Sequence, residues 1–369
     1  MIKSIFEFKK EGINCPIFGD DSIPEYQYDN KYLTSDCSVS EFDQFTLNVY
    51  YSGLLHEISK EVSDAKQFES FCPAFVKKQY NGFAKVHPLQ KKRDIQGASE
   101  VIYRVQEYIK DITGLFAVTT QTNSGLSVKL ATCKILAEYF NELGVTKQKI
   151  VYATKQKTIN LSFAGFTIER VELGSDLQTN LNLIEKAIDE DTACVIIDTF
   201  FAGLSTEPIA KVVEIAHKNG ALVYCESSCF SKALSIVRPA DLGVDIFEFN
   251  AEEVLNIPSL NGFSPLAVCE KLEKYLPQPY AIKDKSGSYT LLVNEKDNWQ
   301  ISTFIGSLNA CVSLYAYLTV LGSDGLKNYA EATQLNCEYL SKLSKGKLNL
   351  KPSECEDFCD LELFVKDNK

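Results

Sequence analysis

Three polar segments of this sequence stand where α/β proteins bind ligands. Glu226 directly follows the apolar run 221–225, and Glu252 and Glu253 come just after the run 244–249. Asn123, Ser124 and Gly125 open a long helical pattern. In a parallel sheet, ligands bind beyond the carboxyl ends of the strands. A carboxylate there could hold a ligand nitrogen, and the free N–H groups of a helix start could bind an anion.

Each segment also has a purely structural explanation. Asn and Ser are preferred helix caps. An acidic pair is favoured in the first turn of a helix by the helix dipole. Glu226 could be a solvated carboxylate at the end of a strand. The residue types alone leave both explanations open.

The elements that would position these residues alternate along the chain. Strands are predicted at 115–119, 150–153, 166–171, 194–197, 221–225 and 244–249, and helices at 98–112, 124–143, 183–188, 207–220, 304–322 and 324–345. The strands are mostly apolar rather than alternating, which is typical of strands covered on both faces. Alternating strands and helices predict a mainly parallel sheet in a three-layer α/β/α fold.

Charge and composition exclude several classes of function. The formal net charge of −11 argues against a nucleic-acid partner. No apolar run approaches the ~20 residues of a membrane span. Twelve cysteines without a C-x-x-C motif favour a reducing compartment. The three histidines are not at metal-ligand spacing with any cysteine, so no metal site is expected.

A series of motifs is spread along the chain in a fixed order. They are Gly82-Phe-Ala-Lys-Val-His-Pro88, Ile95-Gln-Gly97, Ile112-Thr-Gly114, Gln121-Thr-Asn-Ser-Gly125, Asp191-Thr-Ala193, Gly203-Leu204, the segments 215–224 and 238–245, and the stretch 315–340. In their shared order and spacing, from about residue 4 to 345, the chain resembles the P-protein of the glycine cleavage system, specifically its cofactor-binding second half.

The resemblance implies a fold-type I enzyme that uses pyridoxal phosphate, and it also implies that the site has decayed. The family's lysine, which binds the cofactor covalently, falls on Glu253, and the histidine before it falls on Glu252. A carboxylate cannot form a Schiff base. The pyridine-facing acid is Glu226, and the glycine-rich run after the lysine is reduced to 259–263. Lys232 is not expected to replace the lost lysine.

We therefore predict no catalytic residue, loss of pyridoxal phosphate, and a vestigial pocket. The pocket consists of Asn123, Ser124, Gly125, Glu226, Glu252 and Glu253. The expected domains are an N-terminal arm with helices over 1–85, a large domain over 86–295, and C-terminal helices with the remnant of a small domain over 296–369.

The leading hypothesis is a catalytically inactive P-protein homologue with a structural or assembly role in a complex. One alternative is a subunit of an active glycine decarboxylase whose partner supplies the lysine. Another is a binding protein that holds a small ligand in the old pocket. The resemblance implies a same-fold partner, which would cover apolar residues of the C-terminal helices: Ile305, Leu308, Val312, Leu318 and Leu321. It also suggests the mitochondrial matrix, with the cytoplasm as the other possibility.

Overall fold

The computed structural model describes Phe83, Val86, Gln90 and residues 92–154, 165–173, 177–198, 207–227, 230–255, 260, 262–293 and 299–344. Residues 74–333 form one compact unit. The predicted N-terminal arm, apart from Phe83, lies outside the described residues, as does the stretch beyond 344. The domain boundaries at 85 and 295 therefore stay predictions.

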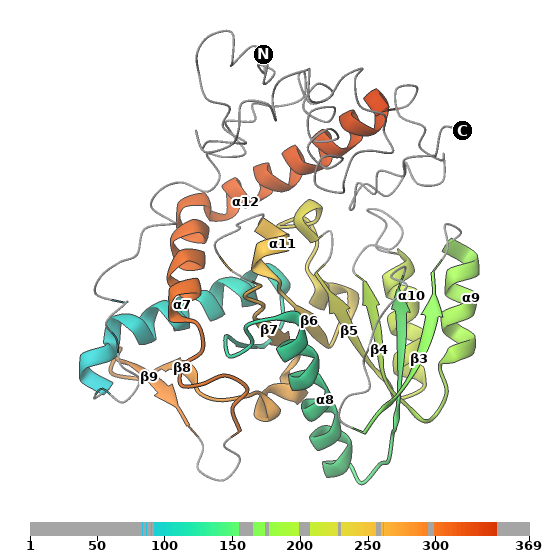
Figure 1. Cartoon of the computed structure of the whole chain (residues 1–369), viewed down its shortest axis with the longest axis horizontal. Coiled ribbons are helices and arrows are strands. Elements are labelled where there is room, and N and C mark those ends of the chain that lie inside the picture. The colour runs from blue at the N-terminus through green and yellow to red at the C-terminus, as the bar shows by residue number, and fades with distance from the viewer. Residues whose placement is uncertain are drawn as a thin grey trace, which may run out of the picture. The chain divides into compact units, whose positions relative to one another are not determined.

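A seven-stranded sheet with the order β1-β7-β6-β5-β4-β2-β3 forms the centre of this unit (Figure 1). β7 is antiparallel to both β1 and β6, and the other neighbouring pairs are parallel. The strands are β1 (Ala117–Thr119), β2 (Lys149–Thr154), β3 (Thr167–Glu172), β4 (Thr192–Asp198), β5 (Leu222–Glu226), β6 (Ile246–Glu248) and β7 (Leu266–Val268).

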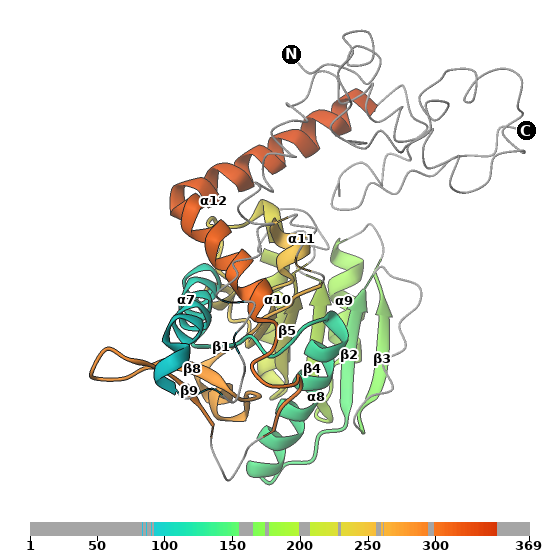
Figure 2. The same ribbon diagram turned by 60° about the vertical axis from the view of Figure 1, so that its left-hand side comes forward.

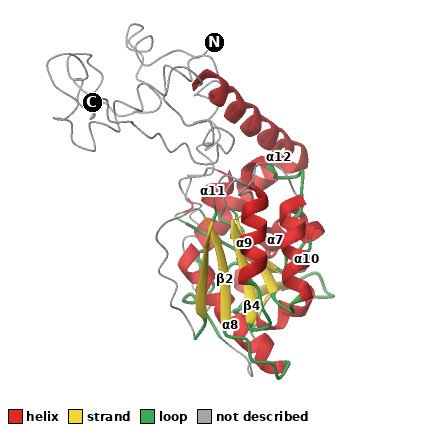
Figure 3. Ribbon diagram, turned by 90° about the vertical axis from the view of Figure 1, so that its right-hand side faces the viewer, coloured by secondary structure: helices red, strands yellow, loops and turns green. Residues whose placement is uncertain are grey.

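Helices cover both faces of the sheet, which gives the three-layer α/β/α fold (Figure 3). α8 (Gly125–Glu142) packs Val128, Ala131 and Ile135 against one face, in a core shared with Tyr152 and Tyr224. The other face is covered by α9 (Leu177–Ala187) and α10 (Glu207–Lys218). Strand residues are therefore buried on both sides, and this explains their apolar composition.

α7 (Gln96–Thr113) packs beside β1 and against the two-stranded sheet of β8 (Tyr280–Lys283) and β9 (Tyr289–Leu292) (Figure 2). The helix ends at Gly114, whose φ of 72° is left-handed and whose N–H donates to the Lys110 carbonyl. A Cβ at Gly114 would lie 3.0 Å from that of Ala240. A larger residue would therefore be strained at this positive φ and would lack space for its side chain.

Short helices complete the described chain. They are η4 (Lys92–Ile95), η5 (Phe230–Lys232), η6 (Pro239–Leu242), α11 (Ala251–Leu255) and η8 (Glu270–Tyr275). The last helix, α12 (Leu308–Ser344), is broken at Gly322, where φ is 60° and ψ is −172°. The kink confirms the predicted break between the helical stretches 304–322 and 324–345.

The sequence predicts the fold class and the order of most of these elements correctly, but it missed β7, β8 and β9. The open apolar surface expected for a partner is wrong at three of its five positions. Ile305, Val312 and Leu318 are buried within this chain, at 8%, 7% and 3% exposure, whereas Leu308 and Leu321 are half-buried. The three buried residues pack inward because the first half of α12 belongs to the same compact unit as the sheet.

Among the described helices, none is long and apolar enough to cross a membrane.

Candidate functional site

Glu226 ends β5 at the carboxyl edge of the sheet, as predicted, and two side chains engage its carboxylate. The Tyr152 hydroxyl donates to both of its oxygens, at 3.1 and 2.9 Å. The Lys129 ammonium, from α8, lies 2.9 Å from Oε1. The Glu226 side chain is only 12% exposed, and that of Lys129 is 23% exposed. Glu226 is therefore a largely buried and fully engaged acid, not a solvated one.

A second carboxylate, Glu248, ends the neighbouring strand β6. It is 5% exposed and accepts a hydrogen bond from the hydroxyl of Tyr224 in β5. Burial raises the pKa of Glu248 to about 7. The Tyr224 hydroxyl and the Lys129 ammonium act against that rise, while the charges of Glu226 and Glu253 add to it.

The start of α8 is capped by its own residues. The Ser124 hydroxyl accepts from the Ser127 N–H at 3.2 Å, and the Ser127 hydroxyl accepts from the N–H of Ser124 at 3.0 Å and of Asn123 at 2.9 Å. This reciprocal arrangement is a capping box. A Cβ on Gly125 would lie 3.3 Å from Oε1 of Glu248, so the backbone here passes close to the second carboxylate.

Glu252 and Glu253 lie in the first turn of α11. The N–H of Glu253 donates to the Asn250 side chain at 3.3 Å, which caps the helix. Oε2 of Glu252 accepts from the N–H of Gly262 at 2.7 Å. Gly262 belongs to the shortened loop that the resemblance aligns with the family's glycine-rich run. The backbone N–H of Gly262 in that loop is therefore already hydrogen-bonded to the Glu252 carboxylate.

The structure brings the predicted residues to one edge of the sheet and adds four that sequence reasoning missed: Lys129, Tyr152, Tyr224 and Glu248. A charged residue in the apolar run 244–249 was the available signal for Glu248. The others come from segments up to about a hundred residues apart, and no spacing rule connects them.

A different network lies at the amino end of β6. Asp245, 5% exposed, contacts Nε2 of His217 at 2.8 Å, the Lys271 ammonium at 2.7 Å and the Val223 N–H at 2.9 Å. Burial alone would raise the pKa of Asp245, but these partners outweigh it and lower the pKa. Burial raises the pKa of the adjacent Cys269 thiol to about 12, so this cysteine is a poor nucleophile.

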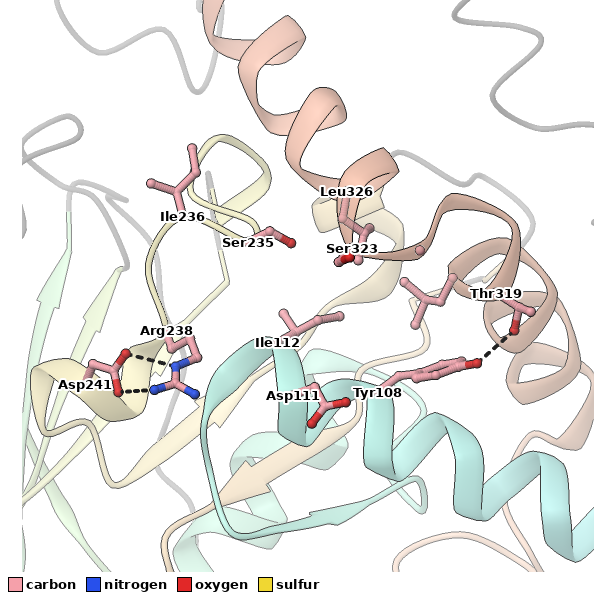
Figure 4. Close-up of a pocket in the computed structure, with 12 residues that line it drawn as sticks. Tyr108, Asp111, Ile112, Ser235, Ile236, Arg238, Asp241, Thr319, Ser323 and Leu326 are labelled. Carbon is pink, nitrogen blue, oxygen red and sulfur yellow. Dashed lines mark hydrogen bonds and ion pairs between the residues drawn. The ribbon is translucent and has the colours of Figure 1, made fainter.

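A cavity of about 490 Å³ opens elsewhere, between α7, the η5–η6 segment and the kink of α12 (Figure 4). Its lining mixes apolar and polar side chains, and the dashed contacts in Figure 4 join Arg238 to Asp241 and Tyr108 to Thr319. None of the predicted site residues lines it. The lining residues are Tyr108, Asp111, Ile112, Ser235, Ile236, Arg238, Asp241, Leu318, Thr319, Gly322, Ser323 and Leu326.

Comparisons with known proteins point in one direction. No family model matches the sequence. The chain is 29% identical over 291 residues to a probable glycine dehydrogenase (decarboxylating) subunit 2 of Chloroherpeton thalassium, covering 75% of this chain and 59% of that protein. It is 27% identical over 354 residues to a protein of the same name from Thermotoga petrophila, covering 92% and 74%.

Among solved structures, the fold is similar to that of a glycine decarboxylase (P-protein) of the glycine cleavage system in inhibitor-bound form. The TM-score is 0.53 at 15% identity, and the match covers 88% of this chain and 76% of that one. At this identity the likeness establishes the fold alone.

Proposed function

Starting from its homology with glycine dehydrogenase (decarboxylating) subunit 2, we propose that this chain is a catalytically inactive relative of that subunit, with a structural or assembly role in a protein complex. The observation that carries the proposal is the residue content of α11. The resemblance places the covalent lysine in this helix, and its sequence is Ala251-Glu-Glu-Val-Leu255. Neither carboxylate can form the bond that such a lysine forms.

The described residues do not fit pyridoxal phosphate in three further respects. Glu226, which would face the ring nitrogen, already has an ammonium ion at 2.9 Å and a phenol hydroxyl at 2.9 Å. The Gly262 N–H, which could serve an anion, is held by Glu252. Glu252 and Glu253 also put negative charge at the two positions that the resemblance assigns to the family's histidine and lysine, and this would disfavour an anionic cofactor.

A partner with the same fold is part of the proposal. The curated relatives are named as a subunit, which implies a companion chain in those proteins. The burial of Ile305, Val312 and Leu318 within this chain removes these three residues from the interface, while Leu308 and Leu321 are only half-buried. Mass spectrometry of proteins that co-purify with the native chain tests this expectation.

The central experiment measures cofactor binding by the Glu253→Lys variant. We expect neither the unchanged chain nor the variant to acquire a borohydride-reducible visible band with pyridoxal phosphate. Each charge-assisted contact with the cofactor is worth about 1.5–3 kcal/mol. The loss of two or three such contacts therefore weakens binding of pyridoxal phosphate by roughly three to five decades. Glu252 would also favour the ammonium form of the new lysine, which is not nucleophilic. Glu253→Gln is the matched control.

Two results would count against the proposal. Stoichiometric binding of pyridoxal phosphate by Glu253→Lys would mean that the pocket is otherwise intact and that the missing lysine is its single defect. Glycine decarboxylation by the unchanged chain together with its co-purified partner would instead favour the active subunit whose partner supplies the lysine.

We also propose a reducing compartment. Cys133, Cys194, Cys269 and Cys311, all within the described part of the chain, form no disulfide. Cys133, Cys194 and Cys311 are buried, where cysteine behaves as a small apolar residue. The relatives compared above are bacterial, so a mitochondrial location stays a prediction.

A further inference from the structure

The Lys129 side chain reaches from the second turn of α8 to the carboxyl edge of the sheet. Its ammonium lies 2.9 Å from Oε1 of Glu226 and 5.7 Å from the centre of the Tyr152 ring. Tyr152 donates to the same carboxylate. One cation, one phenol and one carboxylate from three distant segments thus meet in a mostly buried cluster, at the edge where the fold binds ligands.

The cluster needs a cation because a second carboxylate stands next to it. Glu248 ends the strand beside β5 and is 5% exposed, and its partner Tyr224 is fully buried. Two carboxylates in a poorly solvated site disfavour each other's charge. A tethered ammonium ion offsets that repulsion, and its effect is strongest where water is scarce.

We propose that the Lys129 ammonium is a built-in occupant of this edge, which takes the place of a ligand cation opposite Glu226 and makes the fold independent of a bound cofactor. The inference deepens the proposed function and rests on the loss of the cofactor stated there. It assigns to Lys129 a role that an ion pair on the protein surface would not have.

The surrounding contacts hold this occupant in place. The capping box fixes the start of α8, and Asn123 Nδ2 donates to the Ser302 hydroxyl at 2.7 Å. Gly125, four residues before Lys129, lies against Glu248. Because Gly125 and Lys129 are one helical turn apart, they face the same side of α8, toward the two carboxylates.

The test replaces the tethered cation with a free one. Lys129→Ala removes four atoms, Cγ to Nζ, which n-propylammonium reproduces. We expect the variant to lose about 5–10 °C in Tm, because removing one partner leaves a largely buried charge. Millimolar n-propylammonium chloride should recover most of that loss, since a ligand that binds only the folded state stabilises it. No pyridoxal phosphate is present, so this test is separate from that of the proposed function.

Three controls make the result specific. Lys211→Ala removes a lysine of α10 whose pair with Glu207 is exposed, so its Tm should change little and should not respond to the amine. Lys129→Ala combined with Glu226→Gln should be more stable than Lys129→Ala alone and should also ignore the amine. Sodium chloride at equal concentration controls for ionic strength.

Recovery of Lys129→Ala that is specific to the amine supports the built-in occupant. Should Lys129→Ala fail to fold, refolding with n-propylammonium but not with sodium chloride supports it equally. A Tm for Lys129→Ala within a degree or so of the unchanged chain would overturn the proposal. So would a loss that the amine does not reverse and that Glu226→Gln does not reduce.

Discussion

The two ends of β6 each carry a buried carboxylate, and the pKa values of the two are displaced in opposite directions. Asp245 and Glu248 are three residues apart and both are 5% or less exposed. The pKa of Asp245 is lowered, whereas that of Glu248 is raised to about 7. Burial pushes both pKa values upward, so the difference comes from the partners.

Asp245 has a lysine, a histidine and a backbone N–H around it, and these outweigh the cost of burial. The Tyr224 hydroxyl and the charge of Lys129 lower the pKa of Glu248, but burial and the charges of Glu226 and Glu253 outweigh them. The amino end of the strand is therefore a completed structural network. The carboxyl end holds charge that the fold only partly compensates, which is typical of present or former functional sites.

Asp245→Asn should have the largest effect on stability. The amide cannot serve all three donors, and it leaves the Lys271 and His217 contacts without a carboxylate. We expect a loss of about 3 kcal/mol at pH 7, measured by urea unfolding. Because the folded pKa of Asp245 is lowered, its contribution is present above its unfolded pKa of about 4 and disappears as the pH falls through the folded value.

Asp241→Asn is the matched control for that measurement. The pair of Asp241 with Arg238 is more than half exposed on both sides, so its loss should cost at most about 0.5 kcal/mol. Equal losses in the two variants would mean that burial of Asp245 carries no special weight, and the contrast between the two ends of β6 would then fail.

Glu248→Gln should have the next largest effect, and in the opposite direction. The folded pKa of Glu248 is above the unfolded value, so the native state binds the extra proton. The stability that this group contributes is complete below about pH 4.5 and is lost as the pH rises through about 7. The variant should be about 2 kcal/mol more stable than the unchanged chain at pH 8 and nearly equal at pH 5.

Unfolding curves at the two pH values decide the matter, and a variant less stable than the unchanged chain at pH 8 would contradict the raised pKa. The charged groups around Glu248 are Glu226 on β5, Lys129 on α8 and Glu253 on α11. Lys129 must be kept in all these measurements, since its removal would shift the titration.

The sequence predicts the sheet and helices that carry the two carboxylates better than it predicts the contacts of those carboxylates. Apolar runs such as 194–197 and the capped helix 207–220 identify the parallel sheet and its crossovers, because doubly buried strands and amphipathic helices have local signatures. β8 and β9 were missed, although the Asp284 to Ser288 turn between them, with Gly287, is a recognisable hairpin signal.

The site was predicted only in part, for a physical reason. Glu226, Glu252 and Glu253 follow strands, so their position is readable from local order. The partners of Glu226 are not, because Lys129 and Tyr152 reach it across 97 and 74 positions. Which polar groups satisfy a buried charge depends on the packing of distant segments, and that information is absent from any local pattern.

Tyr224→Phe should have the smallest effect on stability. It measures the contribution of the Tyr224 hydroxyl apart from that of the charged groups around Glu248. Tyr224 is fully buried and its hydroxyl donates to Glu248, so its loss should raise the pKa of Glu248 further. We expect a cost of about 1.5 kcal/mol at pH 8, where the acceptor is charged, and about 0.5–1 kcal/mol at pH 5, where it is neutral. Tyr152→Phe is the control, since Lys129 still compensates Glu226 and the loss should depend less on pH. Equal costs for Tyr224→Phe at the two pH values would mean that Glu248 does not ionise in this range, and the raised pKa would have to be abandoned.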